Sequence, residues 1–260
     1  MTRLKAVLWD MDGTIAETER DGHRVAFNRA FEAMGLAWRW SEDRYGELLR
    51  ITGGRERLLH DMNTQHDAPV SGEREALARA VHARKNALYA DIVQQGGLAL
   101  RPGVLELMAD CRIAGVRMAI ATTTSRSNVE ALLRQQLGER WHERFAAVVC
   151  GEDVGRKKPD PEVYEIALRQ LGLGPLETVA IEDSPGGVAA AQAAGVPVVV
   201  TRSHYFADAA VEAAVAIGPG LAMREGWRPA LPAPADGRDR IGLGDIEAWC
   251  DQMELVSYLP

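Results

Sequence analysis

The hydrophobic pattern of the chain begins with a short apolar run that ends in carboxylates. Residues 6–9 are all apolar, and Asp10, Met11, Asp12 and Gly13 follow them directly. Such a run is too short for an independent helix and predicts a buried strand. Because side chains alternate along a strand, Asp10 and Asp12 would share one face of its end, where Gly13 lets the backbone turn. An exposed turn after an edge strand is the alternative interpretation.

Residues 16–89 have a different pattern, with apolar positions at helical spacing and few strand-like runs. Positions 27, 30, 31 and 34 predict one helix, which Gly35 ends. Residues 42–49, 55–61 and 73–89 predict further helices, with loops at 53–54 and 69–72. We therefore expect residues 17–96 to form an all-helical insert.

After residue 97 the pattern alternates between helix and strand. Helices are predicted at 104–114, 127–137, 161–171 and 186–194, and strands at 116–121, 147–150, 178–181 and 198–201. This alternation predicts an α/β fold, a parallel sheet with right-handed crossovers and helices on both faces. The expected core comprises residues 1–16 and 97–217.

The C-terminal extension, residues 218–260, lies outside this alternation. Gly, Pro and Ala are abundant up to residue 240, which favours an irregular, mobile segment, and residues 241–259 predict a last helix. The sequence leaves open whether this extension packs on the core or meets a partner.

Polar residues follow several of the predicted strands, at the edge where ligands bind in parallel sheets. Asp10 and Asp12 end the first strand, and the other groups are Thr122 to Ser125, Lys157 with Lys158, and Glu182 with Asp183. Two close carboxylates need a cation or a proton between them, and their oxygen atoms suit Mg²⁺. Taken singly, Thr122 could merely cap a strand, and Glu182-Asp183 could cap a helix.

Composition narrows the choice of partners and compartment. The 260 residues are 47% hydrophobic and 26% charged, enough to bury a substantial core, and the net charge of -7 argues against nucleic acid or acidic membranes as partners. The three cysteines form no disulfide or zinc pattern, so we expect free thiols. Without a signal peptide or an apolar span, we expect a cytoplasmic protein, and we expect it to be a monomer.

Four motifs in order resemble the haloacid dehalogenase (HAD) superfamily of phosphotransferases. They are D-x-D-G-T at 10–14, the threonine at 122, K-P-x-P at 158–161 and E-D at 182–183. The resemblance implies a Rossmannoid core with Asp10 as the nucleophile that forms an aspartyl-phosphate, and Asp12 as the general acid and base. Thr122 and Lys158 would bind the phosphoryl oxygens. Mg²⁺ would be held by Asp10, the backbone carbonyl of Asp12, and Asp183, with Glu182 contacting the metal through water or orienting the lysine.

The insert resembles the cap domain of the β-phosphoglucomutase-like subgroup, with hinges near residues 16–18 and 95–100. Further features are Ala16 to Glu19, His23, Trp38, Trp40, Tyr45, Thr52 to Arg57, His82 with Lys85, Ala121 to Ser125 with Asn128, and Lys157 to Pro159. Together they most resemble the CbbY-type phosphatases, which hydrolyse xylulose-1,5-bisphosphate, an inhibitor of Rubisco. One departure is that the stretch from Glu19 to His23 is one residue longer than the pattern. The residues expected to bind the phosphorylated sugar are Glu19, Tyr45, Gly53, Gly54, Arg55, Glu56, Arg57, His82, Lys85, Thr123, Ser125 and Asn128.

Basic residues in the insert have an alternative role, because a polar helix face is often simply solvated. This applies to Arg55 and Arg57, to the cluster of His82, Arg84 and Lys85, and to Lys157. If they do bind, they supply the second cationic site that a bisphosphate needs in an acidic protein. The leading hypothesis is thus a Mg²⁺-dependent sugar-phosphate phosphatase. A phosphosugar mutase of the same fold and a noncatalytic sugar-phosphate-binding protein are the alternatives.

Overall fold

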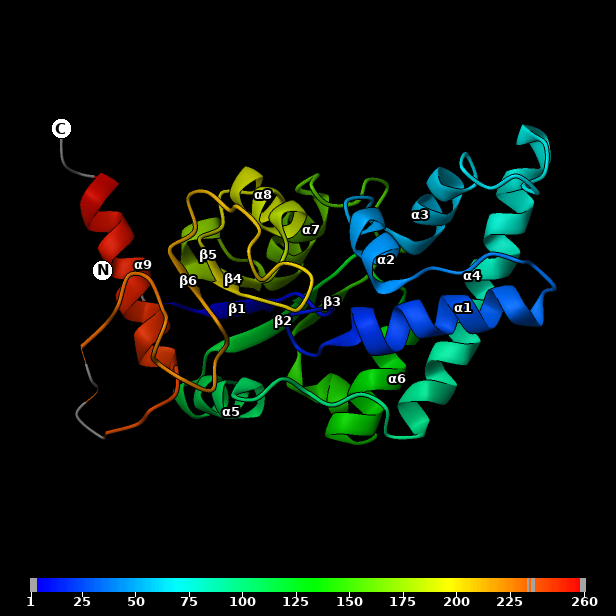
Figure 1. Ribbon diagram of the computed structural model, residues 1–260. Coiled ribbons are helices and arrows are strands. Elements are labelled where there is room, and N and C mark those ends of the chain that lie inside the picture. Colours follow the sequence, from blue (N-terminus) through cyan, green and yellow to red (C-terminus); the bar gives the residue numbers. More distant parts are fainter. Residues whose placement is uncertain (1–3, 233, 235–236, 258–260) are drawn as a thin grey trace.

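The computed structural model describes residues 4–232, 234 and 237–257. Its centre is a parallel sheet with strand order β3-β2-β1-β4-β5-β6 (Figure 1). The strands are β1 (Ala6–Trp9), β2 (Arg117–Ala121), β3 (Ala147–Val149), β4 (Thr178–Glu182), β5 (Val198–Thr201) and β6 (Ala216–Gly218). The predicted α/β class is confirmed. Only β6 among these strands was not predicted.

Both faces of the sheet are covered, as expected from apolar strands that do not alternate with polar residues. Along β1, Val7 and Trp9 pack into one core cluster, whereas Ala6 and Leu8 pack into the other. The first cluster lies under α5 (Val104–Ala114), α6 (Arg126–Leu137) and α9 (Leu243–Ser257). The second lies under α7 (Glu162–Leu171) and α8 (Pro185–Ala193), and short 3₁₀ turns occur at Trp141–Arg144 and Pro175–Glu177.

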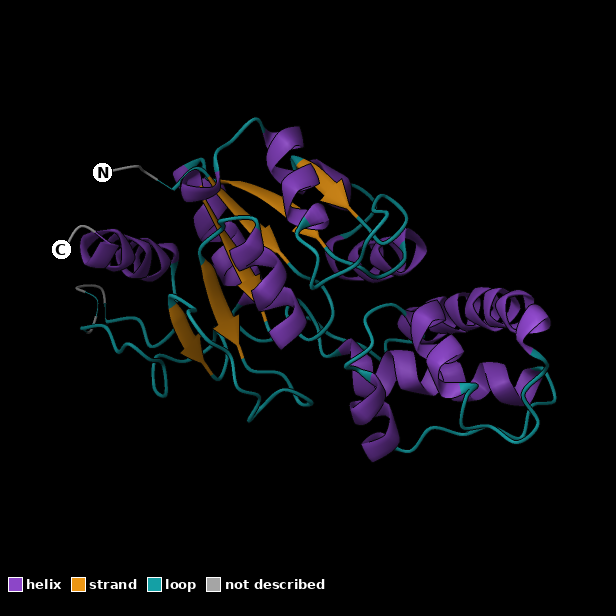
Figure 2. Cartoon of the chain, turned by 90° about the horizontal axis from the view of Figure 1, so that it is seen from above, coloured by secondary structure: helices purple, strands orange, loops and turns teal. Residues whose placement is uncertain are grey.

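The stretch between β1 and α5 is helical and has its own apolar core. It contains a π-helix (Glu19–His23), α1 (Arg24–Ala33), α2 (Glu42–Leu48), α3 (Gly54–Asp61) and α4 (Ser71–Gln94). Phe27, Phe31 and Trp40 form the centre of this core, with Phe27 and Trp40 ring centroids 4.7 Å apart. We call residues 19–94 the helical insert. Figure 2 shows it beyond one end of the sheet, and α4 also contacts α6 of the core.

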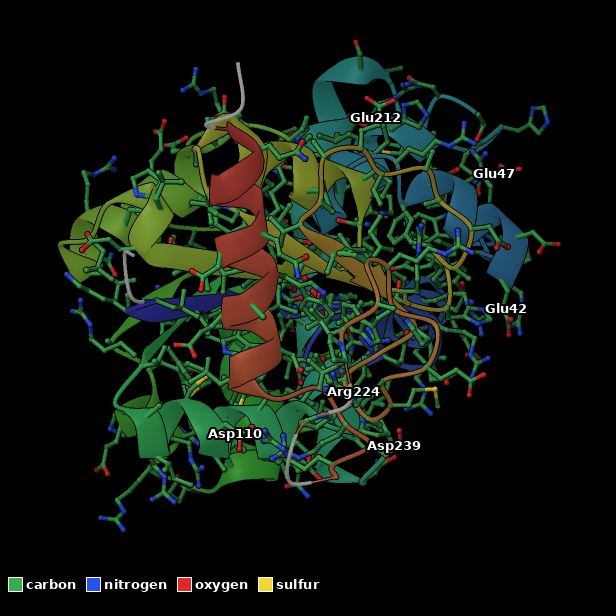
Figure 3. The ribbon with its side chains drawn as sticks, turned by 90° about the vertical axis from the view of Figure 1, so that its left-hand side faces the viewer. Glu42, Glu47, Asp110, Glu212, Arg224 and Asp239 are labelled. Atoms are coloured by element: carbon green, nitrogen blue, oxygen red, sulfur yellow. The ribbon has the colours of Figure 1, made fainter. Side chains whose placement is uncertain are left out.

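The C-terminal extension packs on the sheet core in its described part, which answers a question that the sequence left open. Its described residues between β6 and α9 form no regular helix or strand, in line with the predicted irregular segment. Trp227 and Trp249 stack with centroids 4.8 Å apart, and both join the cluster under α5. Gly218 lets Trp227 lie directly on β6, since a Cβ at Gly218 would come within 2.1 Å of that indole ring. In Figure 3, α9 faces the viewer with Asp110 of α5 near its lower end, and Arg240 forms an ion pair with Asp110 at 2.8 Å.

The chain order of the strands reverses at β1, which lies between β2 and β4. In sheets with this topology the ligand crevice lies outside the carboxyl ends of the strands at the reversal. The helical insert lies at that same end of the sheet. Among the described residues, none of the helices is both long and apolar enough to cross a membrane.

Candidate active site

The end of β1 brings Asp10 beside the acidic end of β4. Trp9 pairs with Ile181, so Asp10 lies level with Glu182, and its backbone N–H donates to the carbonyl of Ile181 at 3.1 Å. Gly13, at φ 85°, makes the sharp turn that follows. A Cβ there would fall 2.0 Å from an oxygen of Asp183, so glycine is what allows this carboxylate to approach the turn.

Asp10, Glu182 and Asp183 form a buried acidic cluster, each offering a ligand atom within 4.8 Å of the others. Burial and the charge of Glu182 raise the pKa of Asp10 to about 8. Burial and the charge of Asp10 likewise raise the pKa of Asp183 well above its ordinary value. A cluster of three carboxyl groups, two of them with raised pKa values, fits a divalent cation, because the cation would supply the missing positive charge.

The ammonium group of Lys158 supplies part of the positive charge that the acidic cluster needs. Its Nζ lies 2.6 Å from both Asp10 Oδ1 and Glu182 Oε1, and it donates to the carbonyl of Ala121 at 2.9 Å. Burial opposes its charge, but Asp10 and Glu182 raise the pKa of Lys158 above its ordinary value. The Tyr164 hydroxyl donates to the same Glu182 oxygen at 2.5 Å. Glu182 therefore contacts Lys158 directly, as the predicted role of orienting this lysine requires.

Asp12 lies in a different electrostatic environment, turned away from the acidic cluster. Its Oδ1 accepts hydrogen bonds from Thr18 Oγ1 at 2.5 Å and His23 Nε2 at 2.9 Å. The other ring nitrogen of His23 lies 2.9 Å from Lys85 Nζ, which donates to it. Although burial opposes ionisation, His23 and Thr18 hold the pKa of Asp12 well below its ordinary value. Its side chain lies outside the group of carboxylates that could hold a metal.

A π-helix at Glu19–His23 brings His23 to Asp12. This wider turn accommodates the one extra residue noticed in the sequence, and π turns of this kind occur often at functional sites. The His23 ring also stacks on Tyr89 at 4.3 Å between centroids. The extra residue was visible in the sequence, but the contact to Asp12 was not.

The Thr122–Asn128 segment supplies donors on the other side of Asp10. Thr122 is buried at the end of β2, and its Oγ1 accepts from the backbone N–H of Thr124 at 3.2 Å. Asn86 of α4 reaches across from the insert and donates to Ser125 Oγ at 3.2 Å. It also accepts from Asn128 Nδ2 at 3.2 Å, while the buried Oδ1 of Asn128 has no partner. Asn86 was not predicted, because no motif marks it.

The insert contributes a wall built around Tyr45. The Tyr45 hydroxyl donates to Glu19 at 2.5 Å and accepts from Arg57 at 2.8 Å. Arg57 is buried and also donates to the carbonyl of Leu48. Glu19 and Arg57 are 3.9 Å apart, so these three predicted residues form one connected group.

The other basic residues predicted in the insert, and the nearby Lys157, differ in their ion pairs and in their exposure to solvent. Lys157 pairs with Glu56 at 2.9 Å, between core and insert, and Arg55 pairs with Glu56 and Glu75. Burial, followed by the charges of Lys85 and Lys157, lowers the pKa of His82 to about 3, so His82 is neutral. Gly53 has a φ of 97°, which disfavours other residues there, and a Cβ at Gly54 would lie 3.0 Å from the His82 ring. Arg84 is exposed and does not line the cavity.

A cavity of about 770 Å³ unites these groups between the sheet edge and the insert. Its lining includes every predicted site residue except Glu182, which lies behind Lys158. Such a volume is within the range of small-molecule sites. The arrangement can place one anion against Asp10 and Lys158 and a polar ligand body against the insert wall.

A family model and the sequences of known proteins both relate this chain to one family. Residues 4–195 match the family model described as haloacid dehalogenase-like hydrolase. The chain is 43% identical over 233 residues to the plasmid-encoded protein CbbY of Cupriavidus necator, covering 89% of each chain. It is 45% identical over 203 residues to protein CbbY of Rhodobacter capsulatus, covering 78% of this chain and 87% of that protein.

Solved structures give the same relationship. CbbY from Rhodobacter sphaeroides in complex with phosphate matches with a TM-score of 0.76 and 40% identity, over 81% of this chain and 92% of that one. A mutant of that protein in complex with xylulose-(1,5)bisphosphate matches with a TM-score of 0.75 and 39% identity, over the same shares of the two chains.

Proposed function

This chain belongs to the haloacid dehalogenase-like hydrolases and is related to CbbY proteins, and from that premise we propose that it is a Mg²⁺-dependent sugar-bisphosphate phosphatase. The proposed substrate is xylulose-1,5-bisphosphate, which would be hydrolysed to xylulose-5-phosphate. The observation that carries the proposal is the lining of the cavity: Asp10 and Lys158 come from the core and suit one phosphate, while the cationic side chains Arg57 and Lys85 come from the insert. The bound ligand of the Rhodobacter sphaeroides relative supports the choice of sugar.

The proposed chemistry starts at Asp10. Its carboxylate would attack the phosphorus atom and form an aspartyl-phosphate, which divides a difficult displacement into two easier steps. Lys158 and Thr122 would bind the phosphoryl oxygens as their charge redistributes. The cluster of Asp10, Glu182 and Asp183 fits Mg²⁺. The proposed ligands are Asp10, Asp183 and the backbone carbonyl of Asp12. Once bound, the cation would screen the nucleophile from the negative charge of the phosphate.

Asp12 would protonate the leaving oxygen and then take a proton from the attacking water. Without substrate it is held as a carboxylate by His23 and Thr18. An entering phosphate would bring negative charge close to it, which favours the protonated form needed for the first step. We propose that the helical insert acts as a cap that excludes water while this happens.

The test is orthophosphate release with Mg²⁺ from xylulose-1,5-bisphosphate, its ribulose epimer, β-glucose-1-phosphate, phosphoglycolate and an aryl phosphate. We expect a strong preference for xylulose-1,5-bisphosphate and no turnover by Asp10→Asn with the fold intact. Isomerisation without phosphate release would instead indicate a mutase, and tight binding without turnover would indicate a noncatalytic protein. Similar slow release from every compound would retain the phosphatase chemistry but refute the proposed substrate.

A further inference from the structure

The loop that leaves β5, residues 202–209, is held by internal hydrogen bonds and contacts the acidic cluster. We call it the β5 loop. The Arg202 side chain ties it together by donating to the carbonyls of Phe206 and Ala209, and the Arg202 backbone N–H donates to Gly218 of β6. Ser203 Oγ donates to Asp183 at 2.5 Å. The start of the loop is therefore fixed relative to the proposed metal ligands.

The same loop also contacts the linker that leads into the insert. The backbone N–H of His204 donates to the Glu17 carboxylate at 3.3 Å, and Glu17 forms an ion pair with Arg101 at 3.6 Å. Glu17 lies in the first connection to the insert, and Arg101 follows the second at Leu100, which bridges to Ala16. The loop thus meets both covalent connections between core and insert.

The tip of the loop packs on the insert itself. The half-buried ring of Tyr205 lies 5.9 Å from the ring of Tyr45, and both Tyr205 and Phe206 pack against the apolar core of the insert. The Tyr205 ring lies close to the backbone of α2 at Gly46, because a Cβ there would come within 3.0 Å of the ring. Glycine inside a helix is less favourable than alanine. Direct packing of the Tyr205 ring on the helix backbone gives a reason for glycine at this position.

Tyr45 is the residue that holds Glu19 and Arg57 at the cavity wall. Tyr205 touches none of the proposed reacting groups, yet it supports Tyr45 from the core side. We propose that Tyr205 is a positioning residue that seats the insert on the core through Gly46 and Tyr45, so that Glu19 and Arg57 face the sugar. This role rests on the proposed function, since it concerns how the sugar end of the substrate is held.

The test compares Tyr205→Ala with Tyr205→Phe, which keeps the ring, and with Asp208→Ala, an exposed position in the same loop. For Tyr205→Ala we expect about a tenfold rise in KM for xylulose-1,5-bisphosphate, the size of effect expected for losing an aromatic pair. Turnover of p-nitrophenyl phosphate, which has no sugar to position, should be unchanged. Tyr205→Phe and Asp208→Ala should behave like the wild type with both substrates.

Gly46→Ala gives a second test from the other side of the contact. It raises helix propensity, so a purely structural role predicts equal or greater stability and unchanged kinetics. The proposal predicts a higher KM for the sugar bisphosphate, because the new methyl group displaces the Tyr205 ring. Unchanged KM in both Tyr205→Ala and Gly46→Ala would overturn the proposal.

A readout that needs no substrate separates this proposal from the proposed function. Amide hydrogen exchange in α2 should be faster in Tyr205→Ala than in Asp208→Ala, because α2 loses its support from the core. Equal exchange in the two variants would overturn the positioning role. If the wild type shows no preference for the sugar bisphosphate, the proposed substrate is wrong, and the exchange comparison alone then decides whether Tyr205 seats the insert.

Discussion

Asp10 and Asp12 lie close together in sequence, but their surroundings shift their pKa values in opposite directions. Burial and Glu182 raise the pKa of Asp10, whereas His23 and Thr18 lower that of Asp12 against the effect of burial. In the free protein these pKa values favour a proton on Asp10, the proposed nucleophile, and a carboxylate on Asp12, the proposed acid, so the proposed roles require bound ligands to reverse both preferences. A bound cation would favour the ionised form of Asp10, and the negative charge of a bound phosphate would favour the protonated form of Asp12.

The first prediction concerns Mg²⁺ and pH. Because Asp10 has a pKa of about 8 and that of Asp183 is also raised, protons compete with Mg²⁺ below pH 8. The Mg²⁺ concentration that half-activates the enzyme should therefore fall between pH 6 and pH 8, by up to about tenfold per pH unit for each proton displaced. Thermal stabilisation by Mg²⁺ should follow the same trend, and Asp183→Asn should lose it. A pH-independent Mg²⁺ requirement would contradict this account.

The second prediction concerns Lys85, whose burial lowers its pKa from 10.5 to about 8. Below pH 8 the amine is charged in both the folded and the unfolded chain, so folding carries the full cost of burying it. Above pH 10.5 it is neutral in both, and that cost is gone. Lys85→Met should therefore raise the free energy of unfolding at pH 7, and this advantage should shrink by up to about 3 kcal/mol as the pH rises through that window.

The same substitution should reduce activity, because it removes the donor that orients His23 toward Asp12. Urea denaturation at pH 7 and pH 10, together with kcat/KM, measures both effects. Arg84→Met, at an exposed position on the same helix, is the matched control and should change neither. A destabilised Lys85→Met variant at pH 7 would show that the ammonium group contributes favourably to folding.

Among the elements, the strand ends were the most predictable part of the site and the π-helix the least. Buried parallel strands are recognisable as apolar runs, so the polar residues that follow them, such as Thr122 and Asp183, could be placed at one edge in advance. A π-helix is set by tertiary contacts, and a single extra residue between Glu19 and His23 was its only trace. Asn86 and Tyr205 were missed because an asparagine or tyrosine on a polar surface carries no motif.

The third prediction removes that extra residue. Deletion of Asp21, which is exposed and pairs only with Arg20 among the described contacts, should restore ordinary helical spacing. Glu19 and His23 could then no longer reach Tyr45 and Asp12 together. We expect kcat/KM to fall by at least about tenfold, since a displaced acid–base group typically costs that much or more, with normal circular dichroism. Asp21→Ala, which keeps the spacing, should retain activity, and an active deletion variant would refute the role of the π-helix.

At the scale of the whole molecule, the extension is part of the fold even though composition suggested a mobile tail. Composition alone could not show that Trp227 and Trp249 would stack, or that Ala216–Gly218 would add β6 to the sheet. So short a strand has no clear pattern of its own in the sequence. It forms because it pairs with β5 and because the Trp227 indole packs over Gly218. Arg101 adds a further link, donating to the carbonyls of Gly13, Arg202 and Pro219.

The fourth prediction tests this packing. Trp249 is 1% exposed, and its indole N–H donates to the carbonyl of Pro229 at 2.9 Å. Trp249→Ala should lower the free energy of unfolding by about 3–5 kcal/mol, through lost burial and the cavity left behind. Because Trp249 lines no part of the active-site cavity, kcat measured well below the melting temperature should stay near the wild-type value. Trp249→Phe should be milder, and an unchanged melting temperature for the alanine variant would contradict the packing described.

The position of α9 also determines how the enzyme could be attached to a surface. The helix lies at the end of the molecule opposite the helical insert, separated from it by the sheet (Figure 1). A tether joined beyond α9 would point the cavity toward solution and leave the insert free to move. An orientation of this kind suits biosensor chips and immobilised-enzyme columns, because the linker lies far from the residues that line the cavity.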